Sequence, residues 1–132
     1  MNSLEEAIYT TLTGGTALVA KLNGTAIYNT LAPQETALPY VVFNKGAGTE
    51  ANSSPRRAQD YVYTVKAVST THKEAGEIDD LVDDLMHDGT LTVTGWNDYW
   101  CRRESDVAYA EPAGDGKLVW HQGAQYRIRL AE

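Results

Sequence analysis

Three histidines and one cysteine are the first side chains to consider for proton transfer, nucleophilic attack or metal binding in this 132-residue chain. They are His72, His87, His121 and Cys101. They do not fall at the spacing of a zinc site, and a single cysteine cannot form an internal disulfide. The chain also contains no G-x-S-x-G, H-E-x-x-H, P-loop or G-x-G-x-x-G motif. We therefore expect no metal, no cofactor and no enzymatic activity, and the alternative is a catalytic site assembled only in three dimensions.

Simpler roles are expected for these four residues. His72 follows the residue predicted to begin a helix, and His87 lies near the end of that helix, where a partial positive charge is favourable. His121 is expected on the polar face of a strand. Cys101 is expected to be a small buried apolar side chain.

Acidic residues are concentrated in the middle of the chain. Seven carboxylates lie between residues 74 and 88, with no lysine or arginine among them. A helix is predicted over residues 75–86, and five of these carboxylates lie on the face opposite its apolar arc: Glu77, Asp79, Asp80, Asp83 and Asp84. The simplest interpretation is a solvated helix face. A metal site is the alternative, but these carboxylates lack the alternating loop spacing and the glycine of an EF-hand.

Aromatic and arginine side chains gather toward the C-terminal end of the sequence, where we expect them to cluster: Trp96, Tyr99, Trp100, Trp120 and Tyr126, with Arg102, Arg103, Arg127 and Arg129. Tryptophan, tyrosine and arginine dominate interface hot spots. The equal alternative is that the tryptophans complete the core and the arginines pair with the acidic helix. A base-stacking platform would use the same residue types, but the acidic composition disfavours it.

A second candidate contact lies in a segment rich in glycine, serine, asparagine and proline, predicted as an exposed loop over residues 47–58. It ends in a pair of arginines. The candidate partner-binding residues are therefore Arg56, Arg57, Trp96, Tyr99, Trp100, Arg102, Arg103 and Trp120.

Length and charge limit the classes of protein that this chain can belong to. Its 132 residues are enough for a single domain over 1–132 with its own core, and 42% of them are apolar. Eleven basic against eighteen acidic residues give a net charge of −7, the wrong sign for gripping a phosphate backbone. The first residues form no signal sequence and no segment is apolar enough to span a membrane, so we expect a cytosol-like compartment and no membrane partner.

Two helices are predicted from the residues at which they begin. Ser3 and Glu6 have capping-box spacing, and Leu4, Ile8 and Leu12 follow at helical intervals. Thr16 is predicted to cap a second, short turn. The same capping-box spacing at Thr71 and Glu74 precedes the clearest helix, whose apolar arc contains Ala75, Ile78, Leu81, Val82, Leu85 and Met86. Gly89 is predicted to stop it.

Strands are predicted from β-branched and aromatic runs. These segments are 27–28, 40–43, 61–68, a start at 91–93, 99–103 and 118–130. Alternation predicts one inward face in the third segment (Tyr61, Tyr63, Val65 and Ala67) and another in the last (Tyr126, Ile128 and Leu130). Short connections favour antiparallel pairing. The predicted fold is α+β, a mostly antiparallel β-sheet packed on one face by two α-helices.

The order of these segments resembles a known family. A capped helix is followed by Ile27-Tyr28, by Ala32-Pro33-Gln34, by Leu38-Pro39-Tyr40-Val41-Val42-Phe43, by a loop, and by a strand ending at Val68-Ser69 before the second long helix. This order is similar to that of the tail terminator, or tail completion, proteins of long-tailed bacteriophages and gene transfer particles. The resemblance extends from about residue 4 to residue 130. Ala67-Val68 departs from it, because a bulkier aromatic residue is expected there.

The resemblance implies a structural virion protein without catalytic residues. It implies a homo-hexameric ring at the head-proximal end of the tail, assembled in the host cytoplasm, which stops growth of the tail tube and contacts the tail tube protein and the head connector, or stopper, protein. DNA would pass through the lumen without specific binding, which the acidic charge favours. Two alternatives remain: another head-to-tail connector component, an adaptor or stopper, and a small α+β enzyme that uses one of the histidines.

Overall fold

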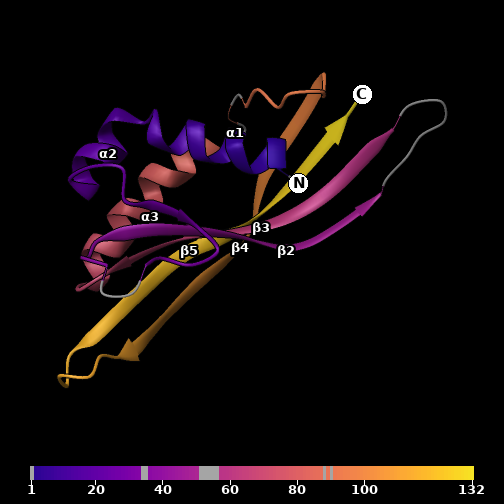
Figure 1. The fold of residues 1–132 in the computed structure, drawn as a ribbon. Helices are drawn as coiled ribbons and strands as arrows, with labels where there is room; N and C mark the ends of the chain where they lie inside the picture. Colours follow the sequence, from indigo (N-terminus) through magenta and orange to yellow (C-terminus); the bar gives the residue numbers. More distant parts are fainter. Residues whose placement is uncertain (1, 34–35, 51–56, 88, 90) are drawn as a thin grey trace.

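The computed structural model describes residues 2–33, 36–50, 57–87, 89 and 91–132 (Figure 1). Three helices and five strands occur in the order α1 (Asn2–Thr13), α2 (Thr16–Leu22), β1 (Ile27–Asn29), β2 (Tyr40–Glu50), β3 (Ala58–Ser69), α3 (His72–Met86), β4 (Asp98–Pro112) and β5 (Leu118–Ala131).

The strands form one five-stranded sheet in the order β1-β2-β3-β5-β4. β1 is parallel to β2, and every other pair is antiparallel. The helices pack on one face of this sheet, and the β4–β5 hairpin projects beyond them (Figure 1). The predicted α+β class, the mostly antiparallel sheet and its one-sided helical layer are confirmed, but the layer contains three helices and not two.

The third helix is α2, which was expected only as a short turn capped by Thr16. Its N-cap is Gly15 in an extended conformation, so Thr16 is the first helical residue. Burial of Leu18 and Leu22 stabilises the full seven-residue helix. The helix ends in a Schellman-type cap, in which Asn23 has φ 57° and Gly24 N–H donates to the Val19 carbonyl.

The capping predictions for the two long helices have different outcomes. α1 includes Asn2, so Ser3 lies inside its first turn and is not the N-cap. At α3 the Thr71 hydroxyl accepts a hydrogen bond from Glu74 N–H at 3.1 Å, as predicted. The Glu74 carboxylate, however, accepts from the Ser69 hydroxyl and does not complete the capping box. β3 and α3 are thereby tied together at their junction.

The strands are longer than predicted, by one to four residues for β1, β3 and β5 and by more for β2 and β4, in each of which the pairing continues past a β-bulge. β2 extends to Glu50 past a bulge between Lys45 and Ala47. β4 extends to Pro112 past a bulge between Arg103 and Ser105. The predicted loop 47–58 is therefore shorter, and its residues 51–56 lie outside the described residues.

The predicted strand start at 91–93 is wrong. Residues 91–93 are irregular, yet Leu91 and Val93 are both buried in the core. Their alternation with polar residues reflects packing of single side chains and not strand pairing. Gly89 was predicted to stop α3, but the helix ends at Met86 and its C-cap is His87 in an extended conformation. A Cβ at Gly89 would lie 2.1 Å from the Leu85 carbonyl oxygen.

The core lies between the helices and the inner face of the sheet, and the inward faces predicted for β3 and β5 are confirmed. Tyr63, Tyr126, Phe43 and Ile128 are among its largest buried side chains. Cys101 is buried in the same cluster, as expected. The opposite face of the sheet has no helix over it in the described part of the chain, and polar and aromatic side chains such as Trp100 and Arg129 are exposed on it.

Candidate interaction surface

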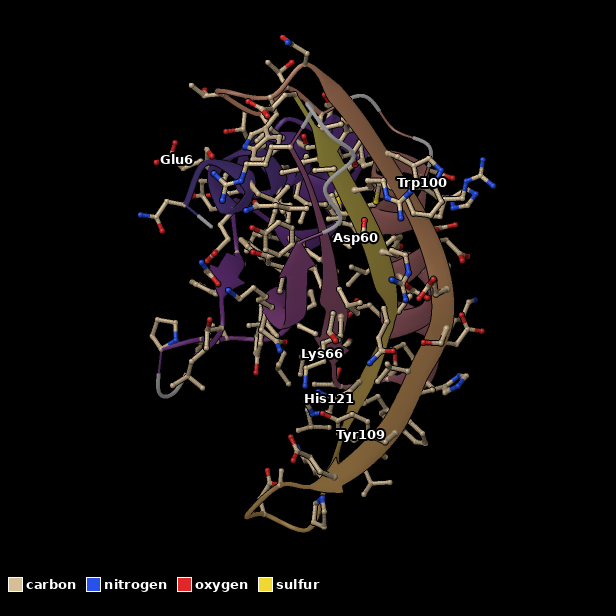
Figure 2. All side chains as sticks on the ribbon, turned by 90° about the vertical axis from the view of Figure 1, so that its right-hand side faces the viewer. Glu6, Asp60, Lys66, Trp100, Tyr109 and His121 are labelled. Carbon is tan, nitrogen blue, oxygen red and sulfur yellow. The ribbon has the colours of Figure 1, made fainter. Side chains whose placement is uncertain are left out.

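The uncovered face of the sheet carries a patch of one tryptophan and three arginines near the start of β4. Arg127 and Arg129 alternate with the buried Tyr126 and Ile128, so they point away from the helices. In the register of the sheet, Trp100 of β4 lies opposite Arg129, and Arg102 lies opposite Arg127. We call Trp100, Arg102, Arg127 and Arg129 the arginine patch; Figure 2 labels Trp100 on the curved edge strand.

Two of these arginines are held by carboxylates on neighbouring strands. Arg129 donates from Nε and Nη2 to the two carboxylate oxygens of Asp60 at 2.7 and 2.9 Å. Arg127 Nε donates to Glu104 at 2.6 Å. The Arg129 hydrogen bonds hold the pKa of the Asp60 carboxyl below its usual value. These pairs fix the orientation of both guanidinium groups, so binding a partner costs less side-chain entropy.

Trp100 and Arg102 form the exposed part of the patch. The Arg102 guanidinium lies 5.5 Å from the centre of the Trp100 ring, within cation–π range. Trp100 is 38% exposed, and Arg102 is exposed as well. An exposed tryptophan beside an arginine is typical of a protein–protein hot spot.

Arg103 has a structural role on the other face of the sheet. Its guanidinium forms a two-pronged contact with Asp79 at 3.1 and 2.9 Å and lies 3.5 Å from Asp83. Asp83 also accepts a hydrogen bond from the Tyr126 hydroxyl at 2.9 Å. These contacts raise the pKa of the Arg103 guanidinium, mainly through Asp79. The interpretation that an arginine pairs with the acidic helix is confirmed for Arg103, and Asp79 is buried and not part of a solvated face.

The predicted aromatic cluster is divided among three places. Trp96 and Tyr99 pack half-buried against the core, and Tyr126 is fully buried. Trp120 lies opposite Ala110, far along the hairpin from Trp100, and its ring is 5.2 Å from that of His72. Sequence proximity did not distinguish these positions, because Tyr99 and Trp100 are adjacent in β4 but face opposite sides of the sheet, and Trp120 lies near the other end of the hairpin.

The arginine pair of the predicted loop contributes one described residue. Arg56 lies outside the described residues. Arg57 is exposed and forms two hydrogen bonds with Glu132. The Arg57 backbone N–H donates to the Glu132 carboxylate at 2.6 Å, and the Arg57 carbonyl accepts from Glu132 N–H at 3.0 Å. Arg57 is therefore joined to the end of β5.

The three histidines occupy separate positions. His72 borders Trp120 at the start of α3, and His87 Nδ1 accepts a hydrogen bond from Arg103 N–H at 3.1 Å. His121 was expected on a polar strand face. It lies on the uncovered face but is 95% buried, since its ring stacks 4.4 Å from that of Tyr109 and Nε2 lies 2.6 Å from the Glu111 carboxylate. Figure 2 shows His121, Tyr109 and Lys66 close together there.

Among the described residues, no group of three histidine, cysteine or acidic side chains is placed to hold a metal ion. No helix in this part of the chain is long and apolar enough to cross a membrane. A cavity of about 510 Å³ lies between α1 and the edge of β1 and β2. There the Glu5 carboxylate accepts hydrogen bonds from the Asn29 side-chain amide and the Tyr63 hydroxyl.

Comparison with known proteins decides the family. Residues 6–130 match the family described as Tail completion protein gp17. The chain belongs to this family. The tail completion protein is also similar to a chain in the solved structure "Virion of native gene transfer agent (GTA) particle", with 20% sequence identity, a TM-score of 0.75, and coverage of 98% of this chain and 95% of that one. No curated protein matches it. The tail completion protein is a structural component of the virion tail, and the predicted resemblance is confirmed.

Sequence reasoning missed Asp60 and Glu104, which orient the arginines of the tail completion protein. The inward face of β3 implied that Asp60 points outward, but its pairing with Arg129 depends on a register that the sequence does not specify. Glu104 lies at the β4 bulge, for which the sequence has no clear signal.

The Arg103 contacts predict a large effect on stability. Arg103→Ala leaves the buried Asp79 carboxylate without its partner, and we expect the free energy of unfolding to fall by about 3 kcal/mol. Arg102→Ala, one residue away on the exposed face, is the matched control and should change it by less than about 0.5 kcal/mol. Urea denaturation of both variants measures the difference. Equal effects would show that Arg103 does not hold α3 to the sheet.

The Asp60–Arg129 pair predicts acid-dependent stability. The pKa of Asp60 is lowered from 3.8 in the folded protein, so the pair stabilises the fold above that pH and loses its effect as the pH falls through the lower folded value. Asp60→Asn should lower the Tm at pH 7, and the difference from wild type should shrink toward pH 2. Thermal unfolding across this range tests it, with the more exposed Glu104→Gln expected to have a smaller effect. A difference that is constant with pH would contradict the assignment.

Proposed function

We propose that this tail completion protein is the tail terminator. In this proposal six copies form a ring at the head-proximal end of the tail tube, stop its growth and join it to the head connector protein. The match to the family over residues 6–130 carries the proposal. Its partners would be further copies of itself, the tail tube protein and the connector.

The two faces of the subunit support a ring of this kind. A closed ring uses heterologous contacts, in which each copy presents two different surfaces. The three helices together contain eight acidic and two basic residues, and Asp80 and Asp84 of α3 are exposed. The opposite face carries the arginine patch. Acidic and basic surfaces on opposite sides of one subunit can complement each other between neighbours.

The net charge supports a conduit for DNA. Six copies at −7 would carry −42, so a DNA molecule passing through the ring would be repelled and not held. The tail completion protein would thus bind DNA neither specifically nor tightly.

The second candidate is a different head-to-tail connector component, an adaptor or stopper. It would have the same size and the same kind of surfaces, but it would act on the head side and would not limit the length of the tube. Tail length therefore separates the two functions.

Deleting the gene in its phage or gene transfer particle should give separate heads and tails whose tubes vary in length and are often too long. Tube subunits stack by a heterologous contact that does not close, so only an added component can end their growth. Electron micrographs of the lysate measure the lengths. Tails of uniform, normal length that fail to join heads would contradict the terminator function and favour the adaptor or stopper.

Arg102→Glu tests the arginine patch in the same system. Supplied to the deletion strain, this variant should fail to restore joined particles, because it reverses one exposed charge beside Trp100. Its Tm should match that of wild type. Lys117→Glu, an equal charge reversal at the exposed hairpin turn, is the control and should restore particles. Full restoration by Arg102→Glu would exclude the patch from essential contacts.

A further inference from the structure

The outer edge of β4 differs along its length. β4 is the last strand of the sheet, so one side of its backbone has no neighbouring strand in the described structure. Near its start this edge is blocked, because His87 accepts the hydrogen bond of Arg103 N–H and a bulge follows between Arg103 and Ser105. At its end, Pro112 has no N–H to offer. The stretch between these two features is an open edge.

The direction of its backbone groups follows from the hairpin. Ala113 N–H donates to the Lys117 carbonyl at 2.7 Å, and residue pairs in an antiparallel ladder alternate between bonded and non-bonded. In steps of two back from Ala113, residues 111, 109 and 107 therefore direct their N–H and C=O groups toward β5. Ala108 and Ala110 then direct their N–H and C=O groups to the open edge. Pro112 also faces the open edge, so its missing N–H removes no hydrogen bond to β5.

Natural proteins usually protect such edges. The opposite side of the sheet has this protection: β1 has only three residues, and β2 carries a bulge beside the exposed Lys45. On β4, every residue from 104 to 112 is exposed except the half-buried Val107. Residues 107–110 are Val-Ala-Tyr-Ala and carry no charge. An uncharged, exposed edge of this kind is suited to pairing with another strand.

We propose that β4 pairs with β4 of a second copy of this chain, antiparallel and centred on Ala108. A two-fold axis there places Ala108 opposite its own equivalent and Val107 opposite Tyr109 of the second copy. Aromatic and β-branched residues form favourable cross-strand pairs. The edge-facing groups of residues 106, 108 and 110 would form the new ladder.

The open stretch is self-complementary about this centre. Pro112 and the bulge residue Glu104 are each four positions from Ala108, so the two blocked ends lie opposite each other. The acids do not oppose one another: Glu104 faces Pro112, Asp106 faces Ala110, and Glu111 faces Ser105. Asp106 also accepts a hydrogen bond from Arg103 of its own subunit at 2.9 Å. Charge, register and length thus all select a second copy as the partner.

This contact is isologous and separate from the heterologous contact of the proposed ring, so the two can be tested independently. Sedimentation over a concentration series should show a dimer for the wild-type chain. Ala108→Pro removes an edge-facing N–H and no bond to β5, and should weaken dimerisation at least tenfold with an unchanged circular dichroism spectrum. Ala108→Val keeps the N–H and should dimerise within about twofold of wild type.

Cysteine substitutions test the register. Ala108→Cys should form a disulfide-linked dimer on mild oxidation, because the residue faces its own equivalent. Ala110→Cys should not, since its equivalent lies four positions away, beyond the reach of a disulfide. Cross-linking of both variants, or dimerisation unaffected by Ala108→Pro, would overturn the proposal. So would a wild-type chain that forms only a ring or stays monomeric; a ring without the dimer leaves the terminator function intact.

Discussion

A five-stranded sheet covered by helices on one face must stabilise its other face in water without a second layer. In this tail completion protein the inner face follows a simple alternation of buried residues, as in Tyr61, Tyr63 and Val65 of β3. The outer face instead uses ion pairs between strands, such as Arg129 with Asp60. Arg129 and Arg127, which form these ion pairs, belong to the arginine patch, so part of the proposed contact surface also stabilises the outer face.

The edge strand has one charged connection to the helical layer among the described residues, besides the packing of Cys101 and Tyr99 against the core. Arg103 reaches from β4 to Asp79 and Asp83 of α3, and Tyr126 completes the arrangement from β5. A charged group this well enclosed is favourable only because its partners are fixed around it. The four aspartates of α3 thus divide into two sets: Asp79 and Asp83 contact Arg103, and Asp80 and Asp84 remain on the surface.

Much of the fold follows from sequence patterns, and the rest depends on contacts that the patterns do not encode. The spacing of apolar residues was sufficient to predict α3 and the inner faces of β3 and β5. The lengths of β2 and β4 were underestimated, because bulges sustain pairing through glycine and charged residues. At the candidate site, residue type left both alternatives open and could not distinguish the exposed Trp100 and Arg102 from the half-buried Trp96 and Arg103. That distinction depends on which face of the sheet each residue of β4 takes near its bulge. It also depends on the register between strands that are far apart in the sequence.

The strand order has a consequence for how the chain becomes structured during synthesis. β5, the last element along the sequence, lies between β3 and β4, so β4 has no neighbour in the sheet until residues 118–131 have left the ribosome. Until then the backbone groups along one side of β3 and along the whole of β4 have no neighbouring strand to pair with. Contacts between such distant residues slow folding and prolong the exposure of unpaired strands. The nascent chain is thus most vulnerable to aggregation just before residues 118–131 emerge from the ribosome.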